Sequence, residues 1–297
     1  MKRILTLCVL IIIPLCLAAA DPDVLQTADQ LYNVRQNEQA IALLEDALVS
    51  ASTQGEQFEI YWRLARHTLD LGDVLYGEGA EKDKLRSVYE RGRGYAEKAI
   101  RLAPDMYQGY YWKAASIGRA AQVKGVINAL FEAKSMRDLL FTVLRMYPDH
   151  GESWYVLGMM YALLPGFPLS FGNNAYAVSL GRRSITANRT ELAAGAVELV
   201  RYSYYLELAK HLWARDWSEA KRNREHTKQA EKYESTTDEI ERNFYYEGSV
   251  AIDNISDRVE AKRILRWIID SIKLIPDPAL IYLSDLERAE ELIDSWE

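Results

Sequence analysis

The chain has 297 residues, of which 49% are hydrophobic and 27% charged, a balance typical of a folded globular protein. Its net charge is −7 and it has no basic cluster, so nucleic acid is excluded as an expected partner. This length allows one large domain or two ordinary ones.

Residues 1–20 have the layout of a secretory signal peptide. Two basic residues follow the initial Met, residues 4–17 are mostly apolar, and Ala18–Ala20 supply the small residues of a cleavage site. A membrane-spanning helix needs about 20 apolar residues, and this run is shorter. We therefore expect export, loss of the leader, and a mature protein formed by residues 21–297.

Cys16 leaves a second interpretation of the leader open. A bacterial lipoprotein would have its acylated cysteine near this position, with Gly, Ala or Ser just before it. Pro14 and Leu15 precede Cys16 here. We interpret Cys16 as part of the apolar signal core and keep lipidation, and with it membrane anchoring, as the alternative.

Beyond the leader, apolar residues recur every three or four positions and no stretch alternates as a strand does, which predicts an all-α chain. Helical units repeat along it. A first unit spans residues 28–47. A second opens at Trp62 and closes with "YAEKAIRLAPD" (95–105), and a third opens at Trp112 and closes with "LLFTVLRMYPD" (139–149).

The clearest unit begins with Trp154-x-x-Leu157-Gly158-x-x-Tyr161, the opening pattern of a tetratricopeptide repeat (TPR). These four residues share one face of a helix, helix A of the unit. The large side chains fill the space against helix B, and the glycine lets the two backbones approach. Small residues at helix-B spacing follow from Ala177 onward.

The units are longer than the roughly 34 residues of a simple TPR, and the extra residues fall between helices A and B. We expect these insertions to lie at one end of the stack, where they often build a binding face. They are residues 76–84, 122–134 and 163–172.

The pattern loosens after Arg189. We expect one long helix over residues 191–212, a solvated helix B over 218–234, another helix B over 261–277 and a capping helix over 280–296. No linker interrupts these segments. The sequence therefore predicts a single TPR-like α-solenoid domain over residues 21–297, with four to six helix pairs and enlarged turns between helices A and B.

Chemistry-bearing motifs are missing from the sequence. Its four histidines do not share the i, i+3 or i+4 spacing of a helical metal site, and neither HExxH nor G-x-S-x-G occurs. We expect no enzyme activity, no metal and no cofactor.

Residues next to the packing stripe suggest a ligand groove. One residue is about 100° of helix turn, so these neighbours should face the concave side. Cations beside aromatic walls suit a carboxylate on an organic body. A solvated face without a ligand is the alternative. The predicted groove residues are Arg63, His67, Tyr110, Lys113, Ile117, Tyr155 and Met159.

Two stretches carry a family resemblance: "GYYWKAASIGRAAQVKGVINALF" (109–131) and "LLPGFPLSFGNNAYAVSLGRRSI" (163–185). The first holds Gly-Arg and Lys-Gly pairs, and the second holds the turn L-P-G-x-P-x-S-x-G. They resemble the T-component family of TPR-associated TRAP transporters, exported bacterial proteins. The resemblance is sharp only between about 105 and 190.

That resemblance implies a periplasmic, non-enzymatic partner of a TRAP solute-binding protein. It also implies a homotrimer, with a hydrophobic pore in each subunit that passes or holds a ligand. The partner is thus expected to be the solute-binding protein, together with a small organic acid or hydrophobic ligand. A general periplasmic TPR scaffold that binds protein segments is the alternative, and an unrecognised hydrolase is a third hypothesis that lacks a candidate cluster.

Two arrangements are expected for the apolar turn between helices A and B of the fourth unit. Its prolines and phenylalanines form a rigid lip at the mouth of a pocket or pore, or its phenylalanines fold back and plug the space between the helices. The residues concerned are Pro165, Phe167, Pro168 and Phe171.

Overall fold

The computed structural model describes residues 22–296. Within that range it consists of twelve α-helices and one 3₁₀-helix, with no strand, so the predicted all-α class is confirmed. Cys16 and the predicted signal peptide lie outside the described residues. No helix between residues 22 and 296 combines the length and the apolar character needed to cross a membrane.

The helices have the following bounds in chain order. They are α1 (Pro22–Asn33), α2 (Asn37–Ser50), α3 (Gln54–Gly77), α4 (Lys82–Leu102), α5 (Tyr107–Lys124), α6 (Val126–Met146), α7 (Gly151–Leu163), α8 (Asn174–Ala193), α9 (Tyr202–Arg215), α10 (Glu219–Ser235), η1 (Glu241–Ser249), α11 (Asp257–Lys273) and α12 (Leu280–Ser295).

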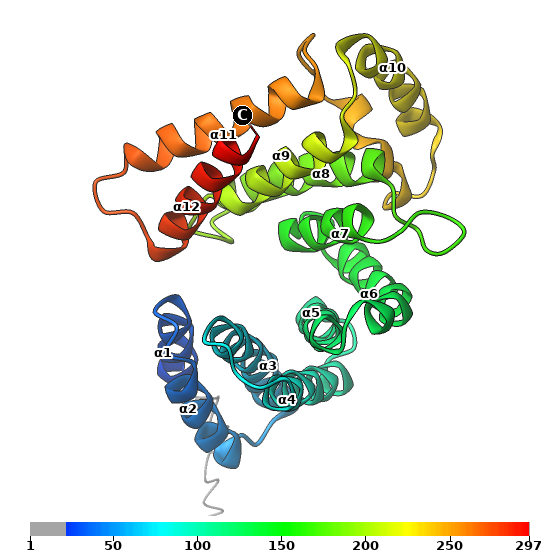
Figure 1. The fold of residues 1–297 in the computed structure, drawn as a ribbon. Helices are drawn as coiled ribbons and strands as arrows, with labels where there is room; N and C mark the ends of the chain where they lie inside the picture. The colour runs from blue at the N-terminus through cyan, green and yellow to red at the C-terminus, as the bar shows by residue number, and fades with distance from the viewer. Residues whose placement is uncertain (1–21, 297) are drawn as a thin grey trace, which may run out of the picture.

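Consecutive helices form hairpins that follow an open curve, with α1 at one end and α12 facing it across the opening (Figure 1). The hairpins are α1–α2, α3–α4, α5–α6 and α7–α8, and a fifth pair is made by α9 and α11. Helices α3, α5 and α7 lie on the inside of the curve, with α4 and α6 outside them. The fold is therefore a TPR-like helical repeat.

Local signals start several of these helices. Thr53 begins α3 with a capping box, in which its side chain accepts from Glu56 N and the Glu56 side chain accepts from Thr53 N. Asn173 and Ser218 cap α8 and α10 with a side-chain oxygen that accepts from backbone N–H groups of the first turn. Each such cap stabilises its helix by about 1 kcal/mol.

The packing stripe predicted on α7 is confirmed. Trp154, Leu157 and Tyr161 are all at most 4% exposed. A Cβ atom on Gly158 would lie 3.5 Å from the carbonyl oxygen of Ala177, an ordinary van der Waals distance, and 3.3 Å from the His211 ring of α9, so the approach of α7 to α8 does not by itself require a glycine.

The long helix predicted over residues 191–212 is wrong. Helix α8 ends at Ala193, and α9 begins only at Tyr202. Gly195 has a φ of 69°, and its N–H bonds back to Leu192 O, which closes the helix as glycines after a C-terminus commonly do. The break resets the face that α9 turns towards its neighbours.

The predicted helix B over residues 218–234 is a helix, α10, but it does not pair with α9. Helix α11 takes that position, and α10 with η1 packs instead against α8 (Figure 1). Ser179 of α8 accepts from Glu247 N at 3.2 Å and donates to Gln229 of α10 at 3.2 Å. The segment from α10 to η1 is thus an insertion in the fifth pair.

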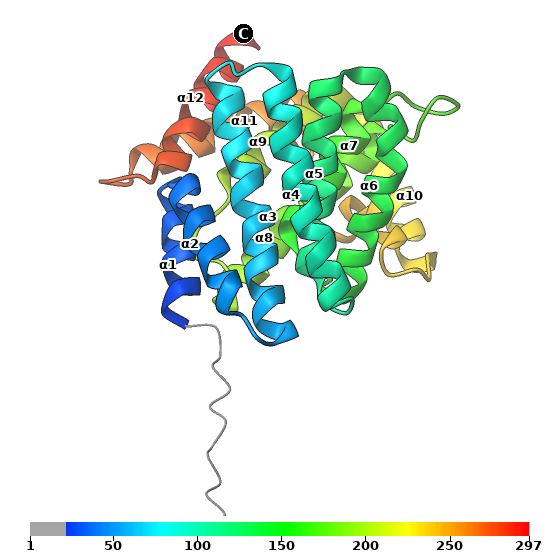
Figure 2. The same cartoon turned by 90° about the horizontal axis from the view of Figure 1, so that it is seen from below.

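The turns between helices A and B do lie at one end of the molecule (Figure 2). Two of the three predicted insertions, however, mostly extend helices. Helix α5 runs to Lys124 and α6 starts at Val126, with only Gly125, at a φ of 99°, between them. The α7–α8 connection alone is a long loop, because its prolines and glycines stop both helices.

Candidate functional site

The seven predicted groove residues do not meet along one surface. Tyr155 and Met159 are partly exposed on α7, as expected, whereas His67 and Ile117 are buried at 0% and 3% exposure. Their contact with a ligand or partner stays a prediction.

Arg63 and His67 lie where α3 packs against the first hairpin. The Arg63 guanidinium pairs with Asp29 of α1 at 2.9 Å and with Glu59 at 2.6 Å. His67 Nδ1 lies 2.9 Å from Asn37 Oδ1, and burial lowers the pKa of His67 to about 3, so the ring is neutral. The 100° step from the packing stripe therefore leads into the α1–α3 contact here.

Lys113 and Tyr110 are held by contacts outside the curve's centre. Lys113 Nζ pairs with Glu97 of α4 at 3.1 Å. The Tyr110 hydroxyl donates to Pro104 O at 3.0 Å, in the turn before α5. Both side chains thus support the α4–α5 packing.

Different residues gather inside the curve, and we call them the inner cluster. Its tyrosines come from four helices, α1, α5, α7 and α9, and are joined by three charged side chains. The inner cluster consists of Tyr32, Tyr111, Tyr155, Tyr204, Arg66, Glu152 and Arg201.

Short contacts and shared electrostatics tie this cluster together. The Tyr155 and Tyr204 rings stack at 4.7 Å, and the Arg66 guanidinium lies 4.4 Å from the Tyr32 ring centre. Burial raises the pKa of Tyr32, and the negative charge of Glu152 adds to the shift. The charge of Glu152 on α7 thus acts on a tyrosine of α1, because the curve brings these two helices towards each other.

A small cavity of about 120 Å³, which we call the inner pocket, adjoins the cluster. It lies where the N-terminal ends of α5, α7 and α9 meet the end of α8. Its lining is Tyr107, Tyr147, His150, Glu152, Asn188, Glu191, Ala196, Val197, Arg201 and Tyr204.

The charged side chains of the inner pocket form no ion pair with Arg201. Arg201 makes no ion pair with any described residue, although the charge of Glu152 raises the pKa of Arg201 against the effect of burial. Burial raises the pKa of Glu191 to about 7 and lowers the pKa of His150 to about 3. No group of metal-ligating side chains occurs in this part of the chain or elsewhere between residues 22 and 296.

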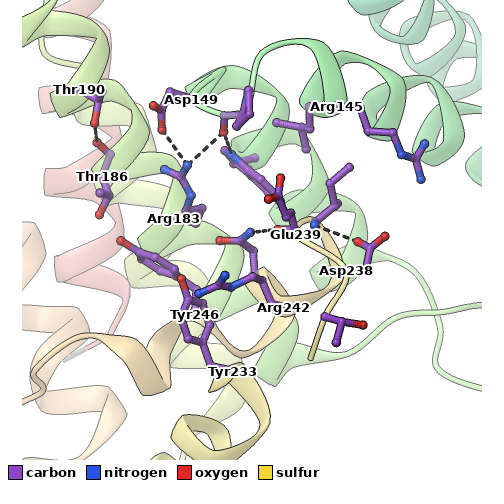
Figure 3. Close-up of a pocket in the computed structure, with 16 residues that line it drawn as sticks. Arg145, Asp149, Arg183, Thr186, Thr190, Tyr233, Asp238, Glu239, Arg242 and Tyr246 are labelled. Atoms are coloured by element: carbon purple, nitrogen blue, oxygen red, sulfur yellow. Dashed lines mark hydrogen bonds and ion pairs between the residues drawn. The ribbon is translucent and has the colours of Figure 1, made fainter. Parts of the chain in front are cut away.

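A larger cavity of about 670 Å³, the outer pocket, opens between the hairpins and the inserted α10–η1 segment (Figure 3). Its volume falls in the range of small-molecule sites. It is lined by Leu144, Arg145, Pro148, Asp149, Trp154, Arg183, Thr186, Thr190, Tyr233, Thr237, Asp238, Glu239, Ile240, Arg242, Asn243 and Tyr246.

Two arginines of the outer pocket differ in their hydrogen-bond and ion-pair partners. Arg183 points to Asp149 and pairs with it at 2.7 Å (Figure 3). The Arg242 guanidinium lies 4.3 Å from the Tyr233 ring centre, makes no ion pair among the described residues, and has a buried Nε without an acceptor. An anion would supply the acceptor that Arg242 lacks.

The two phenylalanines of the apolar turn lie differently, and the lip at the mouth of a pocket or pore stays a prediction, because the turn lines neither of the two pockets. Phe167 is 93% exposed at the tip of the loop. Phe171 is partly buried, packs 4.9 Å from the Tyr161 ring and carries the Arg137 guanidinium at 4.7 Å. One phenylalanine therefore fills the space between α7 and α8, and the other projects. Pro165 is half-buried and Pro168 exposed.

Sequence reasoning misses most residues of the inner cluster, since Tyr155 is its only member among the predicted groove residues. The predicted continuous helix places Arg201 and Tyr204 at its middle, which hides the helix start that aims them inward. The aromatic run "YSYYLEL" after Arg201 is the available signal.

Comparison with known proteins gives limited likenesses. A sequence model of the family described as regulator of microtubule dynamics protein 1-3 matches residues 24–162, less than half of the chain. A thermophilic TPR protein from Thermus thermophilus has a similar solved structure, with 15% identity and a TM-score of 0.49 over 75% of this chain and 95% of that one. No curated protein matches. The T-component resemblance is not matched here, so an association with TRAP transport stays a prediction.

Proposed function

We propose that this protein is a non-enzymatic binding protein that holds a segment of a partner protein against its inner cluster. One observation carries the proposal: tyrosines from four helices gather on the inside of the curve with two arginines. Arg66 pairs with Asp29 and lies over the Tyr32 ring, and Arg201 makes no ion pair among the described residues. Helical-repeat proteins commonly bind along this concave side.

The chemistry of the cluster suits a protein partner. Tyrosine and arginine are enriched among residues whose truncation costs most at interfaces, because they bury large areas and still offer polar groups. Tyr155 is the central choice for a test, since it is partly exposed and stacks on Tyr204.

The first candidate partner is a periplasmic TRAP solute-binding protein, on the strength of the sequence resemblance. In this proposal the chain is exported, acts as an accessory component of organic-acid uptake, and assembles as a homotrimer. A general periplasmic scaffold for other proteins is the alternative, and partner identity separates the two.

Capture from a periplasmic extract tests the proposal. The Tyr155→Ala variant should retain less of the partner than the native chain. Tyr76→Ala is the matched control, because Tyr76 is 56% exposed at the end of α3, away from the cluster. Specific capture of a TRAP solute-binding protein that only Tyr155→Ala weakens supports both binding at the inner cluster and the identity of the partner. Equal capture by both variants would refute binding at the inner cluster.

The outer pocket supports a second candidate function, the binding of an organic carboxylate. The buried, unpartnered Arg242 Nε and the aromatic ring beneath the guanidinium favour it. Titration calorimetry with aliphatic and aromatic carboxylates should give binding that Arg242→Gln weakens about 10- to 100-fold. Binding that the exchange leaves unchanged would place the carboxylate elsewhere.

A further inference from the structure

The inner pocket holds a buried hydrogen-bond donor that lacks an acceptor, beside an arginine without an ion-pair partner among the described residues. Asn188 is 3% exposed, and its Oδ1 accepts from Arg201 N at 3.0 Å, yet its Nδ2 is buried without a partner. The Arg201 guanidinium lines the same pocket and has no ion-pair partner among the described residues. A buried donor without an acceptor, such as Asn188 Nδ2, costs about 1–3 kcal/mol, and a partly exposed guanidinium in the same pocket favours an anion as the acceptor.

The same pocket holds two carboxylates. Glu191 is 7% exposed and accepts only from Gly151 N, at 3.3 Å. Glu152 stands in the first turn of α7 and acts electrostatically on both Glu191 and Arg201 without forming an ion pair with the arginine. The inner pocket thus has two carboxylates and one guanidinium, so a second positive charge would balance its charges.

Aromatic rings complete the wall beside these carboxylates. Tyr107 lies 5.2 Å from the Tyr147 ring and 5.1 Å from His150. Burial keeps His150 neutral, so the imidazole does not supply the missing charge. A small ammonium group is attracted both by carboxylates and by the faces of such rings.

We propose that the inner pocket binds a free α-amino acid with a small side chain. The carboxylate of the amino acid bonds to Arg201 and Asn188 Nδ2, and its ammonium group pairs with Glu152 and Glu191. This places the carboxylate of the zwitterion against Arg201 and Asn188 Nδ2 and its ammonium group against two carboxylates that form no ion pair among the described residues.

The size of the pocket limits the side chain. A volume of about 120 Å³ corresponds to about four water molecules at the volume that each occupies in the liquid. Glycine, alanine or serine fits this space, and an aromatic amino acid does not.

Proton release gives an independent signature of the ammonium group. The groups that face Glu191 are Glu152, Asp149, Arg201, His150, Tyr107 and Tyr147. Burial and the two acidic neighbours hold the pKa of Glu191 at about 7, so a fraction of this carboxyl is protonated at neutral pH. An ammonium group beside it should expel that proton.

Titration calorimetry of the purified chain tests the proposal directly. Glycine and L-alanine should bind, whereas acetate, methylamine and L-phenylalanine should bind at least about 10-fold more weakly, because each offers one charge or exceeds the volume. The binding heat at pH 7 should depend on the ionisation enthalpy of the buffer. Acetate or methylamine binding as tightly as glycine, or no binding of any amino acid, would overturn the proposal.

Variants locate the site. Arg201→Met and Glu152→Gln should each weaken glycine binding about 10- to 100-fold. Arg189→Met is the matched control, since Arg189 is exposed near the end of α8 and contacts Tyr205. Circular dichroism should show that all three variants remain folded. Because no partner protein takes part, failure here leaves the proposed protein binding untouched, and the reverse also holds.

Discussion

A buried ionic network joins the inserted segment to the repeat, and its removal should be costly. Six side chains from α8, α9, α10, η1 and α11 form it, with three positive and three negative charges. Each member takes part in at least one ion pair of 2.8–3.3 Å. The members are Arg182, Arg215, Arg222, Glu247, Asp257 and Glu260.

Glu247→Gln tests the network with little change of volume. Glu247 is 1% exposed and pairs with both Arg182 and Arg215. Burial alone would raise the pKa of Glu247, but these two cations outweigh it and lower the pKa from 4.5 to about 2. At 1.36 kcal/mol per pKa unit, this is about 3 kcal/mol of stability at neutral pH. Removing one partner of a buried ion pair costs about 3–5 kcal/mol, in agreement.

Urea unfolding at pH 7, followed by the fluorescence of the seven tryptophans, Trp217 among them, measures this loss. The Trp217 ring lies 4.1 Å from the Arg215 guanidinium and so reports on the network. With a slope of about 3 kcal/mol per molar urea, the midpoint should fall by about 1 M. Glu290→Gln, which breaks the exposed pair with Lys273, should cost less than about 1 kcal/mol.

The free energy of unfolding at acid pH gives a second readout. Because the folded-state pKa of Glu247 lies below 4.5, its contribution is complete above pH 4.5 and is lost as the pH falls towards 2. The Glu247→Gln variant should therefore lose less stability than the native chain over that interval. Equal midpoints for Glu247→Gln and Glu290→Gln at pH 7 would refute the reasoning.

Three further outcomes are expected. Burial holds the pKa of Glu191 at about 7, above its unfolded value of 4.5. The free energy of unfolding of the native chain should therefore fall by up to about 3 kcal/mol as the pH rises from 4.5 through 7. Thermal unfolding at several pH values should show that Glu191→Gln abolishes this loss. Phe171→Ala should cost about 1–3 kcal/mol in urea unfolding, whereas Phe167→Ser should leave stability unchanged because Phe167 is 93% exposed. Gly172→Ala should lower the melting temperature, since its Cβ would overlap backbone atoms across the loop, while Gly166→Ala, whose Cβ has ordinary contacts, should not.

The repeats could be predicted because their signals are local. Trp154 and its partners repeat at helical spacing within eight residues, and the closing prolines mark helix ends without reference to the rest of the chain. The partner of α9 could not be predicted in this way. Residues 218–234 and 261–277 both have a helix-B pattern. Helix α11 pairs with α9 through a shared apolar cluster and through the Arg215–Asp257 ion pair, whose partners are 42 residues apart.

The inner cluster depends on the curvature of the whole stack, which no short pattern encodes. Tyr32 and Glu152 come together only because several hairpins curve through their full arc. The face that α9 presents depends on the break at Gly195, and a continuous helix would have turned Tyr204 elsewhere. Tyr155 was accessible to sequence reasoning because its neighbours on α7 fix the packing stripe.

Helix α8 links the network to both pockets. Asn188 faces the inner pocket, and Thr186, two residues earlier and thus about 200° around the helix, lines the outer one. Arg182, four residues before Thr186 and thus on nearly the same face, enters the ionic network. The network therefore fixes the rotation of α8 as well as the position of the inserted segment. Since both pockets depend on that rotation, Glu247→Gln should weaken ligands of either pocket even though Glu247 lines neither.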